Sequence, residues 1–215
     1  MSSNASRSRD RMIGWRRFWG NGLSVNALCF DDSAAQIVEF ALSVPLLVLF
    51  VIGIFDFSSA ITLKQKLANA AREGARVAAA DPASDLSASL PVSVADAFDV
   101  IDAYFLSEKI PDCGITRPTL SGTLTWSSNG QTKCPMFGFT LTINRGYYFP
   151  ITGSSSAPAN CATTALTTGQ TAVVATCVSI QYAYSWQFTS ISGFFGNKVL
   201  GPSVINTSAI AFNEN

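Results

Sequence analysis

Residues 40–55 read FALSVPLLVLFVIGIF, a run of sixteen residues without a charged side chain. The neighbouring stretches 34–38 and 57–63 are largely apolar. With Glu39 and Asp56 included, the run reaches the roughly 20 residues that cross about 30 Å of hydrocarbon at 1.5 Å per residue. The stretch therefore predicts one membrane-spanning helix. A buried core helix and the apolar region of a cleavable signal peptide are the alternatives, because the charge-free run is short for a span.

The residues around this run predict its orientation and its length. Arginines gather before it, at Arg7, Arg9, Arg11, Arg16 and Arg17. Since basic loops stay in the cytoplasm, we expect a single-pass protein of the inner or plasma membrane. Its N-terminus is then cytoplasmic and its C-terminal domain periplasmic or extracellular. Helical spacing of apolar side chains continues after the run, so one helix is expected from about Ala34 to Ala80, ended by Asp81-Pro82.

Composition excludes several function classes. Fourteen basic and fourteen acidic residues cancel, so no net field would gather nucleic acid. The chain has no histidine, which removes the commonest general base and the commonest metal ligand. Only 13% of the residues are charged and 48% are apolar, which favours a membrane or secreted protein. We therefore expect a protein that is not an enzyme and that binds no cofactor or metal.

Four motifs follow one another along this part of the chain. They are AQIVEFAL at 35–42, PLL at 45–47, GIFDF at 53–57 and AAREGAR at 70–76. In this order they resemble the TadE-like family, the pilin-like minor components of the tight-adherence (Flp-type) pilus machinery of bacteria and some archaea. The likeness is strong over 33–80 and loose over 176–215.

The resemblance implies processing by a dedicated prepilin peptidase. Such an enzyme cuts just before the apolar helix and leaves a glutamate as the fifth residue of the mature chain. Counting back from Glu39 places the cut between Ala34 and Ala35, and the basic leader 1–34 would be removed together with Cys29. The sequence departs from the family pattern here, because Ala34 stands where glycine is usual.

The resemblance also implies roles in assembly with other pilin-like subunits and platform proteins. Glu39 would pair with the freed amino terminus of a neighbouring subunit and so set the register between helices. Alternatively, Glu39 lies at the membrane interface, favoured by the positive end of the helix dipole. Arg72, Glu73 and Arg76 form either a docking face or a solvated helix face. Asp56 marks the boundary of the hydrocarbon region, or it pairs with a basic residue of a partner.

The rest of the chain predicts a small α+β domain. Residues 81–92 indicate a linker before a domain at 93–215, and Ser93-Val94-Ala95-Asp96 resembles a capping box for a helix that ends near Glu108. Apolar and polar residues alternate at 137–143 and 178–188, with weaker strand candidates at 119–126 and 204–212. We expect three or four antiparallel strands with one or two helices, a surface loop at 153–169, and the aromatic residues of 182–188 in the core.

Four cysteines follow the predicted span, at Cys113, Cys134, Cys161 and Cys177. An even number outside the cytoplasm predicts disulfides, for which three pairings remain open. A four-thiolate zinc site is the alternative, but it favours closely spaced CxxC pairs, which this chain lacks.

Two classes of function remain. The first is a non-enzymatic pilin-like (pseudopilin) subunit that packs its helix in the membrane and displays its outer domain for pilus assembly or adhesion. The second is a membrane-anchored or secreted binding module unrelated to pili. A signal peptide would be cut after Ser58-Ser59-Ala60, so the N-terminus of the mature protein distinguishes the two classes.

Overall fold

The computed structural model describes residues 32–132, 134, 138–151, 160–162, 171–186 and 203–214. The predictions for the leader, for most of 153–169 and for Phe188 therefore lie outside the described residues. The chain divides into two compact units, Met1–Val51 and Ile52–Asn215. The helix α1, Asp32–Ala80, begins in the first unit and ends in the second.

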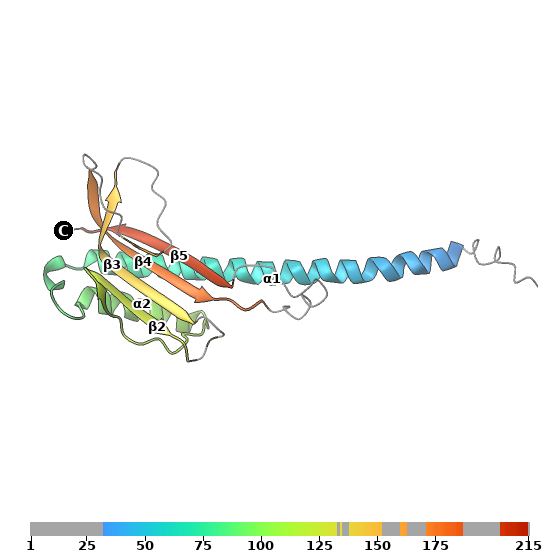
Figure 1. Ribbon diagram of the computed structural model, residues 1–215, viewed down its shortest axis with the longest axis horizontal. Coiled ribbons are helices and arrows are strands. Elements are labelled where there is room, and N and C mark those ends of the chain that lie inside the picture. Colours follow the sequence, from blue (N-terminus) through green and yellow to red (C-terminus); the bar gives the residue numbers. More distant parts are fainter. Residues whose placement is uncertain are drawn as a thin grey trace, which may run out of the picture. The chain divides into compact units, whose positions relative to one another are not determined.

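The second unit contains a five-stranded antiparallel sheet in the order β1-β2-β3-β4-β5. After α1 come a short 3-10 helix, η2 (Ala83–Asp85), and the helix α2 (Val92–Ser107). The strands are β1 (Thr119–Gly122), β2 (Thr125–Gly130), β3 (Phe139–Pro150), β4 (Ala172–Ala183) and β5 (Val204–Phe212). The predicted α+β class is confirmed, and α2 with the last part of α1 packs on one face of the sheet (Figure 1).

The stretch 119–126, expected as one strand, contains β1 and the start of β2. The chain reverses at Thr123 and Leu124, where Leu124 has a left-handed φ of 53°. This raises the number of strands in the described part of the chain to five. An apolar and polar alternation carries no sign of such a reversal when neither turn residue is glycine or proline.

The core lies between the helices and this sheet face. From α1 come Leu67, Ala70, Ala71, Ala75 and Ala78, which are almost fully buried. From α2 come Val94, Ala97, Phe98, Ile101 and Phe105, and the central strands supply Leu141, Ile143, Val178 and Ile180. One side of the stretch 67–78 thus forms part of the domain core, whereas most side chains of 52–62 are exposed. Small side chains on α1 let the two helices approach closely.

The segment 81–91 between the helices is packed rather than extended into solvent. The Trp126 indole donates a hydrogen bond to the carbonyl of Ser89 at 3.0 Å, and Leu86 and Leu90 contact the core. The predicted capping box at Ser93 is wrong. The N-cap residue of α2 is Pro91, and it is Asp85 whose Oδ2 accepts hydrogen bonds from the backbone N–H groups of Val92 (2.6 Å) and Ser93 (3.4 Å). A carboxylate at this end of a helix complements its dipole.

Arg145 of β3 binds the start of the segment between α1 and α2. Its side chain is fully buried, and Nη2 donates to the carbonyl of Asp81 at 3.0 Å, just after the end of α1. Burial lowers the pKa of Arg145, and the charges of Asp85 and Asp81 oppose that shift. A cation at the C-terminal end of a helix is favourable, and α1 has no basic residue of its own in its last turn.

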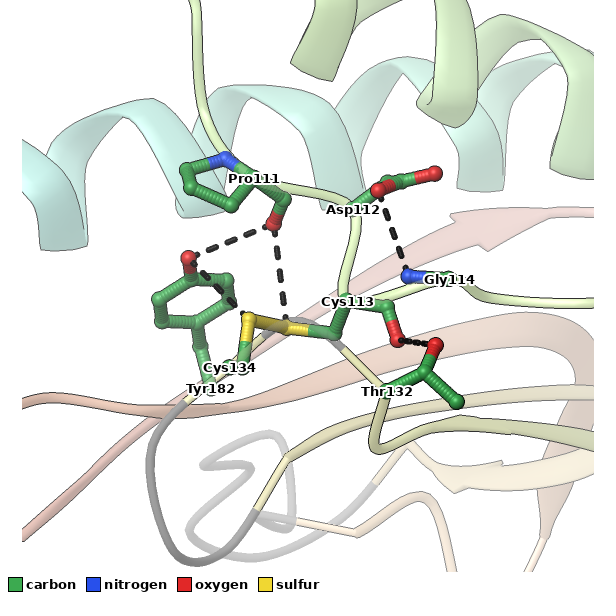
Figure 2. The surroundings of a disulfide bond; sticks show 7 residues. All are labelled: Pro111, Asp112, Cys113, Gly114, Thr132, Cys134 and Tyr182. Carbon is green, nitrogen blue, oxygen red and sulfur yellow. Dashed lines mark hydrogen bonds between the residues drawn. A yellow bond between two sulfur atoms is a disulfide. The ribbon is translucent and has the colours of Figure 1, made fainter.

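The four cysteines form two pairs at disulfide distance. Cys113 and Cys134 have Cα atoms 5.0 Å apart, and those of Cys161 and Cys177 are 5.6 Å apart. The structure thus selects one of the three pairings left open by the sequence. Figure 2 shows the first bridge, where Tyr182 of β4 donates from its hydroxyl to the carbonyl of Pro111 at 3.2 Å.

Candidate functional site on the long helix

The first part of α1 presents apolar side chains outward. Ile37, Phe40 and Leu42 are 69%, 70% and 73% exposed. Within 35–80, the most apolar window has a mean hydropathy of 2.6, and none of that window is buried. By length and composition this helix can cross a membrane. The absence of burial argues against the alternative of a soluble core helix, whose apolar side chains would be covered.

Glu39 lies among these exposed apolar side chains. Among the described residues it forms no ion pair, and its backbone carbonyl accepts a hydrogen bond from the Ser43 hydroxyl at 2.7 Å. Ala34 and Ala35 lie near the start of α1. The roles predicted for these three residues concern partners outside this chain, and they remain predictions.

Asp56 contacts the domain. Its side chain is buried, and the Tyr184 hydroxyl donates to Oδ1 at 3.2 Å and to the Asp56 carbonyl at 3.3 Å. Burial raises the pKa of Tyr184, as do the charge of Asp56 and the hydrogen bond to it. The sequence predicts for Asp56 either a boundary position or a contact with a basic residue of a partner, and it does not indicate the hydrogen bond from Tyr184. Two features of the sequence could have indicated this contact: a single acid among apolar helix residues, and a tyrosine at the end of an alternating strand.

The AAREGAR motif has a buried side and an exposed side. Ala70, Ala71, Gly74 and Ala75 are buried against α2 and the sheet. A Cβ atom on Gly74 would lie 2.7 Å from Cγ1 of Ile101, so this glycine permits the close approach of α1 to α2. The motif therefore carries the contact between the two helices.

The charged residues of the motif, Arg72, Glu73 and Arg76, lie together on the exposed side of α1. Arg72 donates a hydrogen bond to the side chain of Asn69 at 3.2 Å, and the three form no ion pair within the described residues. Their exposure agrees with either of the two interpretations, docking face or solvated face.

Residues 34–76 match the model of one protein family, described as TadE-like protein. The helix is TadE-like. The match covers about a fifth of the chain and confirms the resemblance noted over 33–80, while it does not extend to 176–215. Neither the comparison with curated proteins nor that with solved structures gives a match.

The TadE-like match ends at the last residue of the AAREGAR motif, and it includes both the exposed apolar part of α1 and most of the part that packs in the domain. One N-terminal apolar helix indicates a single-pass membrane protein. The TadE-like family is a structural, pilus-related family. Within the described residues, no group of three or more Cys, Asp or Glu side chains has the geometry to hold a metal ion.

Proposed function

We propose that this chain is a pilin-like (pseudopilin) minor component of the tight-adherence pilus system, anchored by α1 and acting without catalysis. The match of residues 34–76 to the TadE-like family is the observation that carries the proposal. In this role, the apolar part of α1 packs against other helices in the membrane, and the domain that follows it is displayed to assembly partners.

The proposal includes processing by a prepilin peptidase between Ala34 and Ala35. Cleavage there creates an amino group four residues before Glu39. A charged carboxylate costs about 2.5–3.5 kcal/mol at the centre of a membrane and less near the interface, and this cost favours its pairing with a cation. The new amino terminus of a neighbouring pilin-like subunit supplies that cation, and the pair sets the register of the helices. Arg72, Glu73 and Arg76 then serve as a docking face for a subunit or for a platform protein.

The orientation belongs to the same proposal. Basic residues before the span favour a cytoplasmic N-terminus for a protein anchored in the inner or plasma membrane. The cysteine pairs support an oxidising space for the domain, because disulfides persist there and are reduced in the cytosol.

Sequencing the N-terminus of the mature protein tests the processing step. Ala35 as the first residue is the expected result. Ile61 would instead identify a secreted protein cut by signal peptidase, and Met1 or Ser2 would identify an uncleaved anchor. Either of these results contradicts the processing step.

Substitution of Glu39 tests the register role. Glu39→Gln keeps the shape of the side chain and removes its charge, and we expect it to abolish surface piliation with normal cleavage. Asp96→Asn is the matched control, because Asp96 is an exposed carboxylate on α2. Normal piliation of the Glu39→Gln strain would rule out the register role.

A further inference from the structure

A pocket of about 390 Å³ lies within the second unit, beside the part of α1 that follows the apolar run. One wall is α1, and the other is the segment after α2, with a tyrosine of β4. It is lined by Ser58, Ser59, Thr62, Leu63, Lys66, Glu108, Lys109, Ile110, Pro111 and Tyr182. Its volume falls in the range of about 300–1,000 Å³ typical of small-ligand sites.

Lys109 has an unusual backbone conformation for a lysine. It follows the C-cap of α2 with a φ of 56°, where glycine or asparagine is the usual residue. Its N–H donates to Leu106, and the next N–H, of Ile110, donates to Phe105 at 2.9 Å, which closes the helix end. The closure needs no lysine side chain. A strained backbone position occupied by a functional group is a reason to look for a ligand.

The charges in the pocket leave one cation available. Lys66 forms an ion pair with Glu108, with 2.9 Å between Nζ and Oε2. Lys109 is exposed, and among the described residues it forms no ion pair. The side chains that line the pocket therefore carry one net positive charge, which favours an anion of single charge.

Hydroxyl oxygens line the α1 side of the pocket. Ser59 donates its proton to the carbonyl of Phe55 and Thr62 donates to that of Ser58, each at 2.9 Å. With their protons engaged inside the helix, these oxygens remain acceptors for hydroxyl groups of a ligand. A phosphodiester that carries a glycerol group offers both the anion and the hydroxyl donors that this set of residues can bind.

The position along α1 suits a membrane lipid. Ser58 to Thr62 follow Phe55, the last residue of the apolar run, by about 4–10 Å at 1.5 Å per residue. The headgroup layer extends about 5–8 Å beyond the hydrocarbon on each side of a bilayer. The pocket thus opens at the depth where lipid phosphates lie.

We propose that this pocket binds an anionic phospholipid of the phosphatidylglycerol class, with Lys109 as the ligand of its phosphate. The inference rests on the membrane anchoring in the proposed function and not on the role in pili. The opposite wall is fixed by the Tyr182 hydrogen bond to Pro111 and by the Cys113–Cys134 bridge (Figure 2), so the site is held open before the lipid arrives.

The test uses the full-length protein in uncharged detergent and short-chain lipids as probes. Dihexanoyl phosphatidylglycerol is expected to raise the melting temperature in a saturable way, whereas dihexanoyl phosphatidylcholine is not. An equal shift with inorganic phosphate at the same concentration would overturn the lipid assignment in favour of a free-anion site.

Two variants separate binding from folding. Lys109→Gly suits the left-handed backbone, so the variant should be at least as stable as the wild type, yet it should bind phosphatidylglycerol at least tenfold more weakly. Lys64→Ala is the matched control, because Lys64 is an exposed lysine of α1 outside the pocket. Unchanged affinity in Lys109→Gly, or an equal loss in Lys64→Ala, contradicts the proposal. Recovery of the wild-type protein from cells in the soluble fraction would instead contradict the anchoring itself.

Discussion

Asp56 shows how one residue of the long helix connects to the domain. Its motif, GIFDF, is apolar except for this acid, and a buried acid needs a hydrogen-bond donor. Tyr184 supplies one from a segment 128 positions further along the chain. A residue that marks the end of an apolar run thereby also helps to hold the sheet against α1.

Removing the Tyr184 hydroxyl should weaken this contact. Tyr184→Phe is expected to lower the free energy of unfolding by about 1–2 kcal/mol, because a partly buried carboxylate loses a hydrogen bond. Chemical unfolding of the full-length protein in detergent, followed by circular dichroism, measures the change. Tyr148→Phe is the control, since Tyr148 is 43% exposed and should leave stability unchanged. Equal effects of the two substitutions would contradict the contact.

Tyrosine burial also predicts a dependence on alkaline pH. Burial raises the pKa of Tyr182, with a further contribution from Asp112, and the pKa of Tyr184 is raised as well. The folded protein then holds these protons more tightly than the unfolded chain, whose tyrosines titrate near pH 10. The contribution to stability is complete below about pH 10 and is lost as pH rises through the folded pKa values.

Melting temperatures measured between pH 8 and about pH 11.5 test this dependence. The wild type should lose stability steeply above about pH 10, and the double variant Tyr182→Phe/Tyr184→Phe should lose it less steeply. An identical slope in both proteins would show that these two tyrosines do not cause the alkaline loss.

Several decisive residues carried no pattern that sequence reading can use. Arg145 lies in an alternating strand, yet it caps the end of α1 through Asp81, 64 positions earlier. Asp85 caps α2 from seven residues before its first turn, whereas a capping box is sought at adjacent positions. Lys109 adopts a left-handed backbone conformation, which its residue type does not predict. Such roles depend on contacts between distant residues, which one sequence does not display.

Helices and strands with a regular apolar repeat could be predicted from the sequence. The apolar run and the helical spacing after it predicted a helix to about Ala80, and α1 ends at Ala80. The helix expected from Ser93 to about Glu108 is α2, Val92–Ser107. β5 has the bounds expected for the last strand, 204–212. By contrast, the cysteine pairing required the register of β4, because Cys177 lies within that strand.

The contact between α1 and α2 depends on Gly74, which has no side chain. Gly74→Ala should destabilise the protein by about 1–2 kcal/mol, because the new methyl group meets Ile101 in a packed core. This sign is opposite to the gain of about 1 kcal/mol expected from helix propensity alone. Unfolding in detergent measures the change.

Gly53 provides the control for the same substitution. Nothing lies within 4 Å of a Cβ atom added there, so Gly53→Ala should not destabilise the protein. Adding Ile101→Val to Gly74→Ala removes one methyl group from the crowded site and should restore part of the lost stability. A stable Gly74→Ala protein would mean that the helices move apart at little cost.

At the scale of the whole molecule, the two bridges connect segments around the sheet. They close loops with sequence separations of 21 and 16 residues. Chain entropy predicts that each contributes about 3 kcal/mol to stability. We therefore expect the reduced protein to unfold at markedly lower denaturant concentration, and the Cys113→Ser/Cys134→Ser variant to show roughly half of that loss.

Peptide mapping without reductant tests the pairing and the compartment together. Peptides that contain Cys113 and Cys134 should appear linked, as should those with Cys161 and Cys177. When protein taken from cells is denatured in the presence of a maleimide, none of these four cysteines should be labelled. Labelling should appear only after reductant is added. Free thiols at these positions would place the domain in a reducing space and contradict the proposed orientation.

The continuity of α1 has a mechanical consequence. A domain joined to its anchor by a loose peptide would respond to a pull on the anchor by straightening that peptide. Here the same helix contributes buried side chains to the core that it forms with α2 and the sheet, namely Leu67, Ala70, Ala71, Ala75 and Ala78. A pulling force on the anchor therefore acts as shear along the packed surface of α1. Pulling the helix out of the domain would expose that core to water. Separating α1 from the rest of the domain therefore requires the domain to unfold.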